Sequence, residues 1–127
     1  MRERNSGNSR GSIEAKLWPE HLIIFQKVYD LIREVYKDCN NFPKSQRFIL
    51  GQRIENTAVN ILEGIIIANS EGNKLTFLFK VSVEIEKMRI FLRLSKDLAF
   101  LAFKRYEVLT AKLDEIGRMC GGWIKSL

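Results

Sequence analysis

Three basic residues stand at helical spacing in the second half of the chain. Arg89, Arg93 and Lys96 follow one another at steps of four and three residues, which places them on one face of an α-helix. The planar guanidinium group of arginine donates hydrogen bonds in a geometry that suits phosphate oxygens. The spacing predicts a face that binds phosphate or an acidic protein surface, with a merely solvated basic face as the alternative.

Other basic residues extend the candidate binding set to neighbouring helices: Arg53, Lys104 and Arg105. The chain carries 21 Lys and Arg against 15 Asp and Glu, a net charge of +6. A positive balance of this size favours polyanions such as nucleic acid. Aromatic residues do not alternate with the basic ones, as they do where bases stack on a protein. The expected ligand is RNA or DNA, bound through its backbone with little preference for sequence.

The residue types of a catalytic site do not come together in this sequence. His21 is the single histidine, with no second imidazole for a metal and no evident nucleophile beside it. Cys39 and Cys120 lack the spacing of a metal or redox pair, so we expect buried thiols in a reducing compartment. Phosphate-binding and dinucleotide-binding glycine motifs are also missing. We therefore predict no enzyme activity, no catalytic residue, no cofactor and no metal site.

The sequence also lacks the long apolar segments of a membrane or secreted protein. No apolar run reaches the ~18 residues that span a bilayer. The polar stretch 1–12 has no apolar centre of the kind found in a secretory signal. These features predict a cytoplasmic protein without a membrane partner.

Glu63 is a carboxylate in a segment of isoleucines. Burying it without a partner would be costly. It either forms an ion pair with an arginine of a neighbouring helix, for which Arg53 or Arg89 would serve, or it points to water.

Four stretches that must position these residues carry apolar side chains at steps of three and four, the pattern of amphipathic helices. Their approximate ranges are 19–39, 45–69, 74–97 and 102–125. We expect Ser45 to cap the start of the second. Hydrophobic residues make up 46% of the chain. Helices of similar length with short connections predict an all-α, antiparallel up-down-up-down four-helix bundle over residues 17–127, preceded by a disordered polar tail at 1–16.

Apolar residues in the 74–97 helix occupy more than one stripe, which exceeds the need of a monomeric bundle and suggests a subunit interface. Phe91 in this helix and Trp123 in the last one are candidate anchors of the core or of that interface. The pair Gly121–Gly122 beside Trp123 costs helix stability. We expect either the close approach of another helix there or fraying of the C-terminus.

Several short segments resemble known proteins. The order Phe42–Lys44, Asn60–Gly64 and Trp123–Lys125 resembles the four-helix-bundle proteins encoded in intervening sequences of bacterial large ribosomal RNA. Met88–Arg93 and Ile116–Ile124 more narrowly resemble the accessory variability determinant (Avd) proteins of diversity-generating retroelements. The intervening-sequence proteins usually carry a Ser-x-Pro step ahead of the second segment. In this chain the corresponding step is Asn56-Thr57-Ala58, which has no proline, and this favours the Avd branch.

The resemblance implies a function as well as a fold. Avd proteins are four-helix protomers that form ring-like homopentamers with a positive surface. They bind the reverse transcriptase and nucleic acid, template RNA or cDNA, in support of mutagenic retrohoming. Arg89 and Arg93 match basic positions of that family. The alternative is a structural or protein-interaction bundle of the intervening-sequence type, with no nucleic-acid role.

Overall fold

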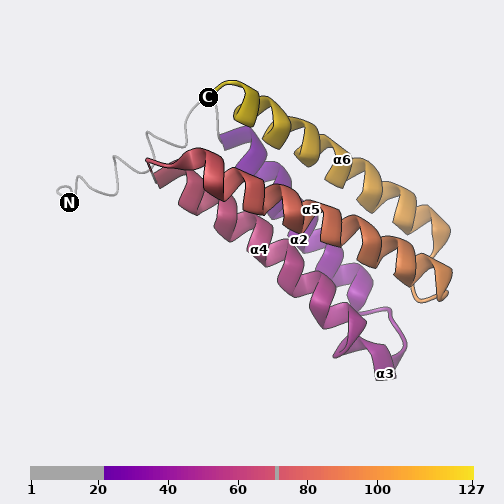
Figure 1. Cartoon of the computed structure of the whole chain (residues 1–127). Coiled ribbons are helices and arrows are strands. Elements are labelled where there is room, and N and C mark those ends of the chain that lie inside the picture. The colour runs from indigo at the N-terminus through magenta and orange to yellow at the C-terminus, as the bar shows by residue number, and fades with distance from the viewer. Residues whose placement is uncertain (1–21, 71) are drawn as a thin grey trace, which may run out of the picture.

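The computed structural model describes residues 22–70 and 72–127, and within them all regular secondary structure is helical. Four long helices and one short helix follow one another: α2 Leu22–Cys39, α3 Lys44–Arg47, α4 Leu50–Ser70, α5 Lys74–Asp97 and α6 Phe103–Lys125. Each long helix packs against the next, and α6 closes the set by packing against α2 (Figure 1). The predicted all-α four-helix bundle is confirmed. The expectations for the tail at 1–16, for residues 17–21 of the bundle and for His21 lie outside the described residues.

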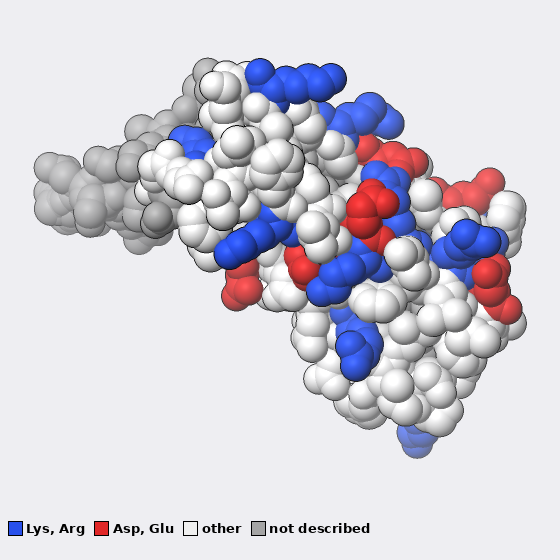
Figure 2. Space-filling model, viewed as in Figure 1, with Lys and Arg blue, Asp and Glu red and all other residues white. Residues whose placement is uncertain are grey.

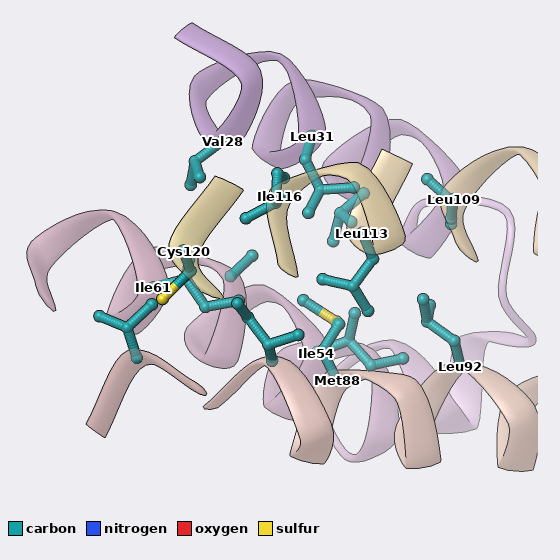
Figure 3. Close-up of a cluster of buried hydrophobic side chains, with 14 of the residues drawn as sticks. Val28, Leu31, Ile54, Ile61, Met88, Leu92, Leu109, Leu113, Ile116 and Cys120 are labelled. Atoms are coloured by element: carbon teal, nitrogen blue, oxygen red, sulfur yellow. The ribbon is translucent and has the colours of Figure 1, made fainter. Parts of the chain in front are cut away.

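One continuous core runs through the bundle. All four long helices contribute to it, and Figure 3 shows their side chains pointing toward a common centre. In α4 the buried apolar residues recur at steps of three and four: Leu50, Ile54, Ala58, Ile61, Ile65 and Ala68. This periodicity is what makes α4 a helix with one apolar face.

The expected helix at 45–69 begins later than predicted. The chain first forms the short surface helix α3, which has no buried residue, and then turns at Phe48 before α4 starts at Leu50. Ser45 lies inside α3 rather than at its N-cap, and Pro43 occupies that position. Phe42, in the connection between α2 and α3, is buried, and its ring lies 6.0 Å from that of Phe100. After the turn the start of α4 packs against the end of α2, where the Cys39 thiol donates to the carbonyl of Gly51 at 3.5 Å.

The connection between α5 and α6 is a tight helix end. Phe100 donates its N–H to the carbonyl of Ser95 at 2.8 Å, and Ala99 donates to Lys96 at 2.9 Å, the two bonds of a Schellman motif. The motif requires a left-handed residue at Ala99, whose φ is +64°. Glycine is the residue that adopts this conformation without a steric cost.

Replacing Ala99 by glycine is therefore expected to stabilise the bundle by about 1 kcal/mol, because the left-handed conformation costs an L-residue about that much. A urea unfolding series, with its midpoint and slope, measures the change. Ala102→Gly, three residues on at a negative φ, is the control. An Ala99→Gly variant no more stable than the original would contradict the assignment of strain to this residue.

The outer side of α5 is apolar and exposed, as the surplus of apolar residues in this helix suggested. Its members recur along one stripe and form what we call the outer stripe: Phe79, Val83, Ile90 and Leu94. The inner side of α5 packs against α4 so closely that a Cβ built on Gly64 would lie 2.5 Å from Cγ2 of Val81. Glycine at position 64 therefore fixes the distance between these two helices.

The expected close approach of a helix at Gly121–Gly122 is not made within the bundle. A Cβ built on either residue would have no neighbouring atom within 4 Å among the described residues. Both lie near the end of α6 on a side against which no described helix packs.

Candidate nucleic-acid interface

Arg89 forms its ion pairs within the bundle. Its guanidinium group hydrogen-bonds Asp114 of α6, and its Nε donates to Glu86 at 2.9 Å. Gly117 leaves room for this side chain, because a Cβ there would lie 2.9 Å from Nη2 of Arg89. The arginine thus joins α5 to α6, and two carboxylates already neutralise its charge.

Arg105 makes a second contact of this kind, between α6 and α2. Its Nε and Nη2 donate to the two carboxylate oxygens of Asp38 at 2.9 and 2.8 Å, a bidentate pair, and Nη2 also donates to Glu34 at 2.6 Å. The hydrogen bond from Arg105 lowers the pKa of Glu34, and the bonds to Asp38 and Glu34 raise the pKa of Arg105. Asp38 is buried, so Arg105 is the group that satisfies it.

Arg93 and Lys96 lie on the same side of α5 as Arg89 and also have an acidic neighbour. Arg93 is 74% exposed and lies 3.8 Å from Asp97, one turn along α5. Lys96 approaches the same aspartate at 3.2 Å and lies 4.8 Å from the ring centre of Tyr106 in α6. Acidic residues therefore accompany these basic residues more closely than the spacing along α5 indicated.

Arg53 and Lys104 are exposed, and neither forms an ion pair with any residue that the structure describes. They lie at the end of the bundle where α4 begins, α5 ends and α6 begins, the same end as Arg93 and as Lys44 of α3. We call these four residues the basic end. Lys44, Arg53 and Lys104 form no ion pair with a described residue, and Arg93 is 74% exposed although it lies 3.8 Å from Asp97.

Charges of both signs mix across the middle of the surface formed by α4 and α5. Figure 2 shows this band of blue and red, with broad uncharged areas on both sides of it. Glu63 is exposed, and Arg89 pairs with Asp114 and Glu86, which agrees with the interpretation that Glu63 points to water.

Residues 22–127 match the model of the bAvd-like family. The chain belongs to the bAvd-like family. The predicted resemblance to Avd proteins is confirmed, while the further link to intervening-sequence proteins stays a prediction. No curated protein matches the chain.

Membership of the bAvd-like family agrees with the absence of catalytic motifs from the sequence, because this is not a known catalytic family. The two thiols are buried, and burial raises the pKa of Cys39 to about 12 and raises that of Cys120 as well. Such thiols are poor nucleophiles at neutral pH. None of the described helices is long and apolar enough to cross a membrane.

The two candidate anchors lie in or against the core. Trp123 of α6 is 8% exposed and belongs to the buried cluster, and Phe91 of α5 packs against that cluster while half-buried. One functional candidate was not recognised in the sequence. Phe48, in the turn before α4, is 79% exposed. Its place in the first turn of an expected helix concealed it, and the adjacent apolar pair Phe48–Ile49 next to the basic residue Arg47 was the available signal.

Proposed function

We propose that this chain is an accessory subunit of a diversity-generating retroelement, which binds the reverse transcriptase and nucleic acid and supports mutagenic retrohoming. The observation that carries the proposal is an exposed basic end, of which only Arg93 has a carboxylate partner among the described residues, in a chain of the bAvd-like family. Uncompensated Lys and Arg side chains attract phosphate and release its counterions.

The structure divides the basic residues of the sequence into two groups with different expected roles. Arg53, Arg93 and Lys104 are exposed and available to phosphate oxygens. Arg89 and Arg105 hold helices together through carboxylates, and opening those pairs to bind phosphate would cost stability. We assign the nucleic-acid contacts to the first group, with Lys96 as a supporting charge.

Removing the charges of the first group is expected to weaken binding. The triple variant Arg53→Gln, Arg93→Gln, Lys104→Gln should bind single-stranded RNA about tenfold less tightly and should lower the slope of log K against log salt by about 2. Fluorescence anisotropy across a salt series measures both quantities.

A matched control removes three charges that are already paired. Lys27, Lys37 and Lys87 each approach a glutamate, at 3.4, 4.0 and 2.9 Å. Changing all three to Gln gives the same net charge as the first variant. Equal losses in the two variants would mean that total charge matters and that the basic end does not.

We also propose that the outer stripe packs against further copies of the chain, with five copies as the number that the family implies. Exposed apolar side chains at helical spacing favour association. Ile90, which is 65% exposed, lies within the stripe. Ile90→Asp is expected to reduce the mass in solution to that of one chain, 14.8 kDa.

Light scattering coupled to gel filtration checks this, with Ile23→Asp on α2, also exposed, as the control. A mass of one chain for the unmodified protein at micromolar concentration would refute self-association.

A further inference from the structure

A shallow hollow of about 390 Å³ lies beside the turn between α3 and α4. Five residues line it: Phe48, Ile49, Gln52, Arg53 and Asn56. The last four follow one another at steps of three, one and three in sequence, so Ile49, just before α4, lies on the same side as Gln52, Arg53 and Asn56 of its first turns. The hollow therefore combines an aromatic ring, two amides and a guanidinium group on one small surface.

The turn that presents Phe48 is held by hydrogen bonds on both sides. Arg47 donates its Nε to the carbonyl of Phe42 at 3.2 Å, and Ile49 donates its N–H to Gln46 at 3.2 Å. The backbone N–H of Arg53 donates to Ile49 at 3.2 Å and begins the ladder of α4. These bonds fix the backbone that carries the ring, which lowers the ordering entropy that a ligand stacked there would cost.

The polar groups of the hollow are not used elsewhere in the described chain. The side chains of Gln52 and Asn56 are exposed and make no hydrogen bond with another described residue. Each amide offers donors and an acceptor, the groups that read the edge of a nucleobase. The guanidinium of Arg53, one turn from Phe48, would lie within reach of a phosphate attached to a base stacked there.

Two other hollows on the described surface contain carboxylates. The hollow of about 310 Å³ between α5 and α6 is lined in part by Glu86 and Asp114, and the hollow of about 440 Å³ between α4 and α5 by Glu63 and Glu84. Carboxylates repel phosphate. The hollow at Phe48 has none in its lining, and the first turn of α4 carries no acidic residue.

We propose that the hollow at Phe48 binds one unpaired nucleobase of a single-stranded nucleic acid, which stacks on the phenyl ring while Arg53 contacts the adjoining phosphate. Stacking needs a base whose face is open, so the site accepts single strands and rejects duplexes. The inference rests on the proposed nucleic-acid function and adds base stacking to the contacts with the phosphate backbone that the sequence suggested.

The test compares probes that carry bases with one that does not. The full chain is titrated with an oligouridylate of about 12 nucleotides, within the size that such sites cover. The same titration is made with an abasic strand of equal length and charge, and with a duplex. The unmodified protein should bind the oligouridylate at least about fivefold more tightly than the abasic strand, the lower limit for one stacked base.

Phe48→Ala should abolish that difference and leave the affinity for the abasic strand unchanged, while Phe48→Trp should retain it. Arg53→Gln should weaken binding of both strands alike, because it removes a phosphate contact. Phe103→Ala is the matched control, since Phe103 is 60% exposed but begins α6, which is not among the helices that form the hollow.

The outcomes separate this inference from the proposed function. If Phe48→Ala retains the preference for bases over the abasic strand, the site is wrong while nucleic-acid binding stands. If Phe48→Ala changes the mass in solution or the binding of the reverse transcriptase, and leaves RNA affinity intact, the hollow is a protein contact and the inference falls. If the unmodified protein binds none of the strands, the proposed function fails and the inference fails with it.

Discussion

Replacing Trp123 by alanine is expected to lower the free energy of unfolding by about 3–5 kcal/mol, the usual cost of removing a buried tryptophan. Trp123 is 8% exposed and lies in the cluster that joins all four long helices. It also lies within the last turn of α6, which ends at Lys125. Losing this anchor removes much of what holds the end of α6 on the bundle.

Urea unfolding followed by circular dichroism measures the loss, and hydrogen exchange locates it. In Trp123→Ala, the protection of backbone amides from exchange should fall most in the last two turns of α6, because they depend most on this contact. Trp123→Phe keeps an aromatic ring in the same place and should lower the free energy of unfolding by less than half as much as Trp123→Ala. Ile124→Ala, a half-buried neighbour, is a second reference. Equal stability of Trp123→Ala and the unmodified chain would mean that the end of α6 does not contribute to the fold.

The helices of this protein are predictable because the apolar residues of each recur with the period of a helix. Residues 74–97 form a helix in the structure with the expected bounds, and the last helix starts one residue later than expected. The start of α4 is not predictable in this way. A continuous helix from residue 45 has the same local preferences, and the packing of Gly51 against Cys39 at the end of α2 is a tertiary contact that no local pattern reports.

The candidate site is less predictable than the fold, for a different reason. The spacing of Arg89 and Arg93 reports their positions on one helix but not what faces them from the next. Asp114 lies 25 residues after Arg89, and Asp38 lies 67 residues before Arg105. Pairs at such separations depend on how far each helix is rotated about its axis, and no local pattern encodes that rotation. Basic residues that look alike in the sequence thus differ in the structure, where Arg89 and Arg105 pair with distant carboxylates and Arg53 and Lys104 are exposed.

These roles can be separated, because basic residues that hold helices together should affect stability while those of the basic end should affect binding. Arg105→Met is expected to lower the free energy of unfolding by about 2–3 kcal/mol. It leaves Asp38, which is buried, without its bidentate partner. Breaking a buried pair costs about 3–5 kcal/mol, and the partial exposure of Arg105 reduces that figure. Lys104→Met, on the exposed neighbour in α6, should change stability by less than about 0.5 kcal/mol.

The pH dependence of unfolding provides the decisive measurement for Arg105. Its hydrogen bond lowers the pKa of Glu34 in the folded state. A carboxyl group with a depressed folded pKa stabilises the protein above its unfolded pKa, and this contribution is lost as the pH falls through the folded pKa. The unmodified chain should therefore lose stability below about pH 4, and Arg105→Met should lose less over the same range.

The double variant Asp38→Asn, Arg105→Met should recover part of the loss at neutral pH, because it leaves no buried charge. If the single variant matched the unmodified chain in both stability and pH dependence, the contact between α2 and α6 would be a surface pair of no consequence, and Arg105 would return to the set of residues available to phosphate.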